Sequence, residues 1–285
     1  MLFFTFILPL LLIALLLFAL VAFLTQPRIP DVAKSAPFYG RNYAHRGLHT
    51  RDKSVPENSL AAFRAAVEAG YGIELDIQLS RDGKVVVFHD DDLLRVCGIN
   101  GRVDDYTLAE LQRFSLCGTA ERIPLLSEVF EVMGGKTPMI IELKSGPNNN
   151  TLCETALPLM RAYRGAFCIE SFDPRIVRWF KQNAPDLLRG QLADAPKQYT
   201  TMPRIAGFAL GNLLSNFLCR PEFIAYNNIA KPFCVRRVDK LGSLKVLWTA
   251  RDEADAARVE AENDLVIFEF YRPAVFYKDL PLAAR

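Results

Sequence analysis

Eight short apolar runs, separated by stretches with helical character, constrain the fold of this chain most strongly. Such alternation is typical of a parallel α/β architecture, because each parallel strand needs a long crossover connection. The runs fall within roughly 240 residues, close to the ~250 of a single (β/α)₈ barrel. We therefore predict an α/β fold with a (β/α)₈, or TIM, barrel over residues 43–285. The expected strands are residues 43–46, 72–76, 138–143, 166–171, 187–192, 223–227, 245–249 and 265–269.

A ninth apolar run, Val85–His89, does not belong to this count. The turn before it has Asp82-Gly83 at its tip and is too short for a parallel crossover. The run is therefore predicted to pair antiparallel with the second strand. That pairing returns His89 to the level of Asp76, at the carboxyl end of the strand. Residues 77–123 then form a small insertion after strand two.

Capping residues predict where several helices begin. Asn58 is expected to cap a helix running from Ser59 to Ala69, and Asp173-Pro174 opens another. A helix is expected near Leu125–Met133. The last one is expected to start at Asp252 and to run through Glu262.

The amino-terminal 24 residues are apolar enough to cross a membrane. Leu2 to Leu24 contains no charged residue and is longer than the about 20 residues that a span requires. A secretory signal would start with a basic residue and end at small side chains, whereas this run ends Phe23-Leu24-Thr25. A buried helix of a soluble protein is disfavoured because the run has no polar face. We expect a single transmembrane anchor over residues 1–24 and a proline-containing linker over 25–42.

Charge next to the span predicts its orientation. Arg28, Lys34 and Arg41 follow the apolar run, so the positive-inside tendency places the rest of a single-pass cell-membrane protein in the cytoplasm. The six cysteines are scattered without a C-x-x-C pair, which fits that side, although an even count also allows three disulfides outside the cell. A net charge of +2 argues against a nucleic-acid partner.

Acidic residues interrupt two of the apolar strands. Glu74 and Asp76 lie near the carboxyl end of strand two, and Glu142 lies at that of strand three. Active sites of (β/α)₈ barrels lie at this end, and buried carboxylates need partners. Three converging carboxylates suit a hard divalent cation, Mg²⁺ or Ca²⁺, with Mn²⁺ also acceptable. A salt-bridge network with Arg or Lys is the alternative.

Two of the three histidines stand beside these carboxylates. His45 ends strand one and His89 ends the hairpin, so each can transfer protons near neutral pH. His49 is expected to be solvated or to support the site. Arg46 and Lys144 follow the reactive positions and could hold a phosphate. The set predicts a metal-assisted phosphodiesterase.

Several short motifs, in order and spacing, resemble the glycerophosphodiester phosphodiesterase family. The similarity is dense over residues 43–145 and weaker beyond, at Ser171-Phe172-Asp173-Pro174 and Val246-Leu247-Trp248-Thr249. The combination is specific to the family, although no single motif is. The motifs are His45-Arg46-Gly47, Pro56-Glu57-Asn58-Ser59, Glu74-Leu75-Asp76, Asp82-Gly83, His89-Asp90 and Ile141-Glu142-Leu143-Lys144.

The resemblance implies a TIM barrel with an insertion after strand two that hydrolyses glycerophosphodiesters to glycerol 3-phosphate and an alcohol. It implies general acid and base roles for His45 and His89, and phosphate contacts for Arg46 and Lys144. It further implies a divalent cation on Glu74, Asp76 and Glu142, with Glu57 and Trp248 in supporting positions.

The chain departs from the family at two places. Ser59 replaces the commoner Thr, and the last strand reads Ile267-Phe268-Glu269-Phe270 where the family usually has Thr-Asp. The second departure leaves the alcohol specificity open. Residues 205–218 are also unusually apolar, which predicts either packing on the barrel or an amphipathic lid that touches the membrane.

Other functions are compatible with these motifs. One is a lysophospholipase D that hydrolyses lysolipids in the bilayer, which the anchor and residues 205–218 favour. Another is a non-catalytic phosphodiester-binding protein, which is disfavoured because no motif histidine or carboxylate is lost. The sequence leaves open which histidine is the acid, and whether water or the substrate's own hydroxyl attacks.

Overall fold

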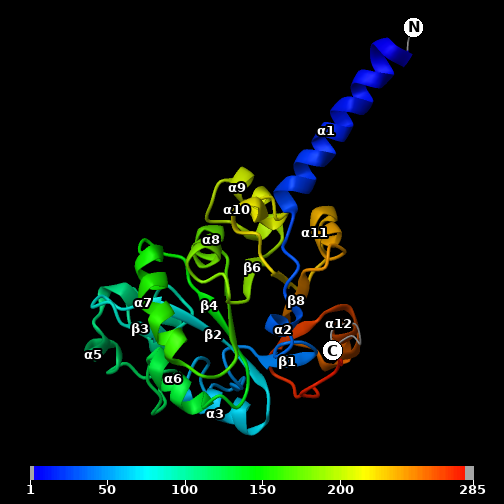
Figure 1. Ribbon diagram of the computed structural model, residues 1–285. Coiled ribbons are helices and arrows are strands. Elements are labelled where there is room, and N and C mark those ends of the chain that lie inside the picture. Colours follow the sequence, from blue (N-terminus) through cyan, green and yellow to red (C-terminus); the bar gives the residue numbers. More distant parts are fainter. Residues whose placement is uncertain (1–2, 280–285) are drawn as a thin grey trace.

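Eight parallel strands close into a barrel in the computed structural model, which describes residues 3–279 (Figure 1). Around the barrel each strand pairs with the next, and β9 returns to β1, which itself pairs with β2. The predicted TIM barrel is confirmed, with only small shifts at strand ends. The barrel strands are β1 (Arg41–Ala44), β2 (Gly72–Leu79), β4 (Met139–Leu143), β5 (Phe167–Ser171), β6 (Arg189–Ala193), β7 (Phe223–Asn227), β8 (Leu244–Ala250) and β9 (Leu265–Phe268).

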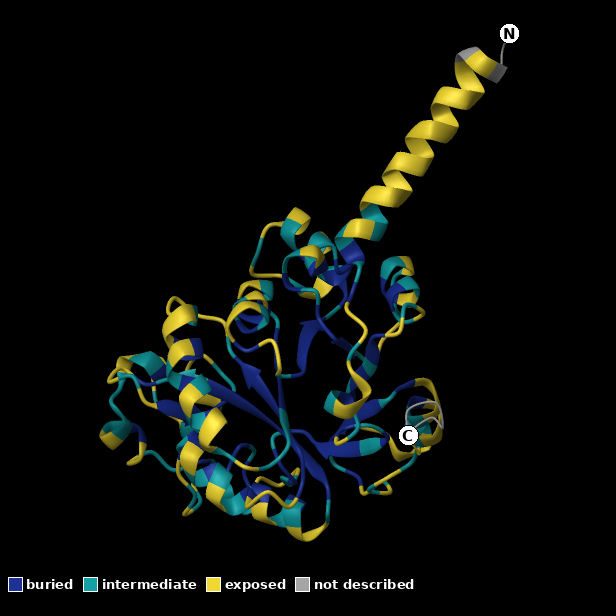
Figure 2. Ribbon diagram, in the orientation of Figure 1, coloured by how far each residue is buried: buried dark blue, intermediate teal, exposed yellow. Residues whose placement is uncertain are grey.

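Helices cover the outside of the barrel, and their buried faces meet the dark strands in Figure 2. A second core fills the inside, where Tyr43, Ile140, Phe223 and Ile267 pack together. The outer helices are α3 (Leu60–Glu68), α6 (Leu126–Met133), α7 (Asn149–Ala162), α8 (Pro174–Asn183), α9 (Arg204–Gly211), α10 (Asn216–Cys219), α11 (Phe233–Val238) and α12 (Ala256–Glu262), with 3₁₀ turns η3 (Pro196–Gln198) and η4 (Glu253–Asp255).

The strand after the Asp82-Gly83 turn, β3 (Val85–Val87), pairs antiparallel with the end of β2, as predicted. Val87 lies opposite Ile77, and the Phe88 N–H donates to the Asp76 carbonyl at 2.9 Å. His89 therefore returns to the level of the β2 carboxylates. The rest of the insertion carries α4 (Leu94–Cys97), η2 (Val103–Asp105) and α5 (Leu108–Leu111) around a small core of its own.

One predicted cap is wrong. Ser59, and not Asn58, caps α3, because the Ser59 hydroxyl accepts from the Ala62 N–H at 3.1 Å. Asn58 has a left-handed backbone with φ of 53°, and its side chain points to the active-site end of β2. The other two caps are confirmed. Asp173 accepts from the backbone at the start of α8, and Asp252 does so at the turn that leads into α12.

The apolar amino-terminal segment forms a helix, α1 (Leu8–Thr25), preceded by a π-helical turn, η1 (Phe3–Ile7). The predicted anchor includes Met1 and Leu2, which lie outside the described residues. Figure 1 shows α1 projecting from the barrel, and Figure 2 shows that its residues are exposed except near its carboxyl end. By length and composition α1 could cross a membrane, and a signal sequence would have the same properties.

The carboxyl end of α1 is fixed to the barrel. Arg220 donates from Nη1 to the carbonyls of Phe23 and Gln26, both at 2.8 Å, and Asn216 Nδ2 donates to the Thr25 carbonyl at 3.1 Å. The segment that follows, which contains α2 (Val32–Ser35), also lies against the barrel. For example, the Arg28 N–H donates to the Pro221 carbonyl at 2.8 Å. Because of these contacts, α1 is held beside α10.

Candidate active site

Three buried carboxylates meet at the carboxyl end of β2 and β4. Glu74 and Asp76 alternate along β2 and therefore point to the same side, into the barrel. The register places Glu142 of β4 directly beside Asp76. One oxygen from each of the three lies within 4.8 Å of the other two. The structure thus brings together the three predicted cation ligands.

The pKa values and hydrogen bonds of these carboxylates indicate that positive charge is missing between them. Burial and the neighbouring acids raise the pKa of Glu74 well above its usual value, and burial likewise raises the pKa of Glu142. Burial opposes ionisation of Asp76 as well. Nevertheless His89, Lys144 and Arg46 hold the pKa of Asp76 low. The buried Asp76 Oδ1 has no hydrogen-bond partner. An orphaned oxygen among crowded acids fits a divalent cation.

Two cations border the carboxylates. Lys144 Nζ lies 2.8 Å from Glu142 Oε1 and 3.5 Å from Asp76 Oδ1. Arg46 Nε lies 3.5 Å from Asp76 Oδ2. The ion-pair alternative considered from the sequence is therefore present in part. It leaves Asp76 Oδ1 without a hydrogen bond.

His45 directly follows β1 and is buried. Its Nε2 lies 3.9 Å from Glu74 Oε2, so the imidazole borders the carboxylates. Burial, and next the charge of Arg46, lower the pKa of His45 to about 4. The ring is therefore neutral near pH 7, which leaves one ring nitrogen able to accept a proton.

His89 belongs to a chain of charged groups on the other side of the rim. Its Nδ1 lies 2.6 Å from Asp90 Oδ1, which leaves Nε2 available. Asp90 binds Arg95 Nε at 2.6 Å, Arg95 binds both oxygens of Glu57, and Glu57 accepts from Arg46 Nη1 at 2.6 Å. Despite its burial, Glu57 has a pKa lowered to about 2 by Arg95 and Arg46. Asp90 and Arg95 were not identified from the sequence as parts of this network.

Trp248 packs against Phe172, a residue that lines a pocket at this rim. Its Nε1 donates to the Ala225 carbonyl at 3.2 Å, and its ring meets Phe172 edge-on with centroids 5.6 Å apart. Phe172 lines a pocket of about 320 Å³ that opens over the site. The other residues that line this pocket include Glu142, Lys144, Asp194, Tyr199 and Met202.

A fourth buried carboxyl was missed. Glu170 of β5 lies beside Glu142 in the register, and its Oε2 has no hydrogen-bond partner. Burial, followed by the charges of Glu142 and Asp76, raises the pKa of Glu170 well above its usual value. The signal was available, because a glutamate in the apolar run Phe167–Ser171 needs a partner as much as Glu142 does.

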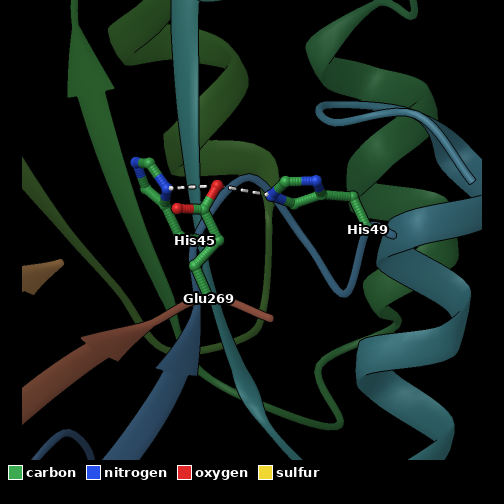
Figure 3. Close-up of side chains that lie close together, drawn as sticks. All are labelled: His45, His49 and Glu269. Atoms are coloured by element: carbon green, nitrogen blue, oxygen red, sulfur yellow. Dashed lines mark ion pairs between the residues drawn. The ribbon is translucent and has the colours of Figure 1, made fainter. Parts of the chain in front are cut away.

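Glu269, which follows β9, meets two histidines (Figure 3). Its Oε1 lies 3.6 Å from His45 Nδ1 and 3.0 Å from His49 Nε2, and its Oε2 accepts from Arg251 Nε at 2.6 Å. The His49 side chain is 7% exposed, so of its two expected positions, solvated or supporting the site, the structure favours the supporting one. Glu269 stood out in the sequence only as a departure from the family pattern.

The fold and this cluster define a (β/α)₈-barrel enzyme whose rim suits an anionic ester substrate. The profile of the glycerophosphoryl diester phosphodiesterase family matches residues 45–271. The chain belongs to this family. It is 40% identical, over 163 residues, to a glycerophosphodiester phosphodiesterase of Caldanaerobacter subterraneus subsp. tengcongensis. That alignment covers 52% of this chain and 65% of the relative.

Two further comparisons extend this result. The chain is 37% identical over 154 residues to lysophospholipase D GDPD1 of Rattus norvegicus, which covers 50% of this chain and 47% of the relative. The structure of an Oleispira antarctica phosphodiesterase in complex with the product sn-glycerol-3-phosphate superposes with a TM-score of 0.67. It covers 84% of this chain and 95% of that chain. At 23% identity, that superposition supports the fold alone.

Proposed function

We propose that the protein hydrolyses glycerophosphodiesters to glycerol 3-phosphate and an alcohol, with a divalent cation and two histidines. The observation that carries this proposal is the convergence of Glu74, Asp76 and Glu142 with two imidazoles at one rim of the barrel. Family membership supports the same reaction class.

Glu74, Asp76 and Glu142 would hold the cation, and Mg²⁺, Ca²⁺ and Mn²⁺ suit their oxygen donors. When bound, such a cation polarises a phosphoryl oxygen and offsets the charge that develops there. Arg46 and Lys144 border the same position, so they would orient the phosphate and add countercharge.

His45 and His89 would move the protons. Neutral His45 can accept the proton of the attacking hydroxyl through a ring nitrogen. The Nδ1 of His89 faces Asp90, so Nε2 is the ring atom free to deliver a proton to the departing alkoxide. Because its lowered pKa leaves His45 neutral and able to accept a proton, we assign His45 as the base, and we assign His89, whose Nε2 is free, as the acid.

Product analysis tests the proposal. Purified protein is incubated with glycerophosphocholine or glycerophosphoethanolamine, with Mg²⁺ and then with excess EDTA, and the released glycerol 3-phosphate and alcohol are quantified. We expect both products with Mg²⁺ and neither with EDTA. Tight binding of the phosphodiester without any product would instead support the non-catalytic alternative.

A lysolipid substrate is the second candidate. Ile205 and Phe208 of α9 are exposed, and the base of α1 packs against α10, where the Phe23 and Phe217 rings lie 6.1 Å apart. These apolar side chains would lie near the bilayer if α1 spans it. A relative that covers half of this chain is named a lysophospholipase D. Release of choline from lysophosphatidylcholine at a rate matching the soluble diester would favour this substrate.

We further propose that α1 anchors the barrel at the cytoplasmic face of the cell membrane. Arg28, Lys34 and Arg41 follow the span, which favours this orientation. A reporter that works only in the cytosol should be active when it is fused after Arg285, and a reporter that works only outside the cytosol should be inactive there. Reporter activity on the outer side would reverse the orientation, and loss of the amino-terminal segment from the mature protein would identify a signal sequence.

A further inference from the structure

The cluster formed by His45, His49 and Glu269 lies beside the carboxylates but has a different chemistry (Figure 3). It offers two nitrogens and one oxygen, whereas the carboxylate cluster offers oxygen only. One ligating atom from each residue lies within 4.8 Å of the other two. The three side chains come from opposite ends of the chain, and the pairing of β1 with β9 brings them together.

The distances to Glu269 Oε1 are compatible with ligands that share an ion. Glu269 Oε1 lies 3.0 Å from His49 Nε2 and 3.6 Å from His45 Nδ1. Ligand atoms at about 2.0–2.2 Å from a tetrahedral Zn²⁺ are themselves roughly 3.3 Å apart.

Both imidazoles pair with Glu269, but the pairing leaves the two ring nitrogens without a well-aligned hydrogen bond. Neither His45 Nδ1 nor His49 Nε2 has an aligned hydrogen-bond partner, although both atoms are buried. The His49 and Glu269 side chains are 7% and 8% exposed, so water does not readily satisfy them. Buried polar atoms without a hydrogen-bond partner call for an explanation, and a bound ion is one.

The surroundings complete such a site. Arg251 binds Glu269 Oε2 at 2.6 Å, which leaves Oε1 for the histidines. The His49 ring packs edge-on against Phe270, with centroids 5.0 Å apart, and this contact fixes its plane. A cavity of about 200 Å³, lined in part by His49, Arg51 and Phe270, gives an ion a route from solvent.

We propose that His45, His49 and Glu269 form a second metal site that prefers Zn²⁺ to Mg²⁺ or Ca²⁺. A metal ion bound at this site would inhibit the enzyme. The selectivity follows from the donors, since imidazole nitrogens favour Zn²⁺ over Mg²⁺ or Ca²⁺. An ion bound to His45 Nδ1 leaves the proton on Nε2. His45 can then no longer accept a proton, and releasing the Nε2 proton would create an imidazolate. The inhibitory part rests on the proposed role of His45 in hydrolysis.

Binding is measured first, without substrate. Full-length protein in detergent micelles with saturating Mg²⁺ is titrated with ZnCl₂ by calorimetry, and we expect one tight equivalent. His49→Gln and Glu269→Gln should each weaken this binding at least about tenfold, the scale of a lost ligand or its support. Glu142→Gln is the matched control, because it alters the carboxylate cluster and should keep the Zn²⁺ equivalent. Failure to bind, or equal binding by all variants, would overturn the site.

Zinc-edge X-ray absorption gives a test that does not depend on how the variants fold. Wild-type protein with one Zn²⁺ should show the multiple-scattering pattern of two imidazoles, and a first shell of oxygen alone would contradict the site. Hydrolysis of glycerophosphocholine is then followed with and without Zn²⁺. We expect strong inhibition of the wild type and a clearly smaller inhibited fraction for His49→Gln. Tight binding at this site without inhibition would overturn the link to His45, and inactivity under every condition would instead count against the proposed function.

Discussion

Asn58 Nδ2 donates a hydrogen bond of 2.9 Å to Asp76 Oδ2, which joins the loop before α3 to the carboxylates at the end of β2. Both side chains are buried, and the Asn58 N–H also donates to the Arg46 carbonyl at 2.9 Å. One oxygen of Asp76 is thereby held, while Oδ1 remains without a hydrogen bond. Asn58 thus orients one of the three carboxylates that we propose as cation ligands.

Substitution of Asn58 should weaken cation binding. In Asn58→Ala, Asp76 loses its orienting donor, and loss of a partner of this kind typically costs about 10–100-fold in metal affinity. The Mg²⁺ concentration for half-maximal activity should rise by that factor, with a smaller change in kcat at saturation. Ser59→Ala is the control. It removes the α3 cap, so it should lower stability by about 1 kcal/mol and leave the Mg²⁺ requirement unchanged.

Removal of the cation should abolish turnover. EDTA is expected to stop hydrolysis, and Mg²⁺, Ca²⁺ or Mn²⁺ should restore it, because Glu74, Asp76 and Glu142 offer oxygen donors. Glu74→Gln, Asp76→Asn and Glu142→Gln should each raise the metal requirement more than they lower the melting temperature. Full activity in excess EDTA, with no metal in the purified protein, would eliminate the cation site.

The histidines should differ in their effect on rate. His45→Ala and His89→Ala should each lower kcat by roughly 10² or more, the scale of a lost general acid or base. His49→Ala should have a clearly smaller effect on kcat with Mg²⁺ alone. Steady-state kinetics on glycerophosphocholine checks this ranking. A loss at His49 equal to that at His89 would contradict the assigned roles.

Ionisation of Glu57 should make the free energy of unfolding fall as the pH is lowered in the acidic range. Its pKa in the folded protein is lowered to about 2 by Arg95 and Arg46, below the ordinary value of 4.5. Its contribution is therefore present above pH 4.5 and is lost as the pH falls toward 2. The contribution is on the order of 1 kcal/mol after allowing for solvent screening at the half-exposed Arg95. Urea unfolding at pH 7 and pH 3 should show a smaller drop for Glu57→Gln than for the wild type.

The sequence was informative wherever a local pattern determines the structure. Period and spacing located the eight strands, and the Asp82-Gly83 turn fixed the antiparallel return that brings His89 to Asp76. The cap of α3 was misplaced because Asn58 and Ser59 are both good cap residues, and only the tertiary bond to Asp76 decides between them.

The contacts that sequence reasoning missed depend on closure of the barrel. Glu269 and His49 meet because β9 pairs with β1, and no local pattern reports that contact. Arg95 lies on α4 of the insertion and pairs with Glu57 and Asp90. The sequence predicted the insertion but not the course of the chain within it. Glu170 is different, since its position in an apolar strand was visible in the sequence.

The exposed face of α9 should decide between soluble and lipid substrates. Phe208 is 58% exposed, so of the two alternatives for residues 205–218, packing on the barrel does not describe its side chain. If α9 meets the bilayer beside α1, Phe208→Asp removes apolar burial worth about 1.5–3 kcal/mol, which corresponds to a tenfold or greater loss on lysolipid in vesicles. Hydrolysis of glycerophosphocholine should be unchanged.

The control for Phe208→Asp is Leu94→Asp. Leu94 is also an exposed apolar residue, at 56%, but it lies on α4 of the insertion. The Leu94→Asp variant should leave both activities unchanged. The melting temperatures of both variants should match that of the wild type, because neither aspartate enters the core. Parallel loss on both substrates with a lower melting temperature would show that Phe208 stabilises the fold. Unchanged lysolipid hydrolysis in Phe208→Asp would mean that α9 does not contribute to contact with the membrane, and the lysolipid candidate would then lose its structural support.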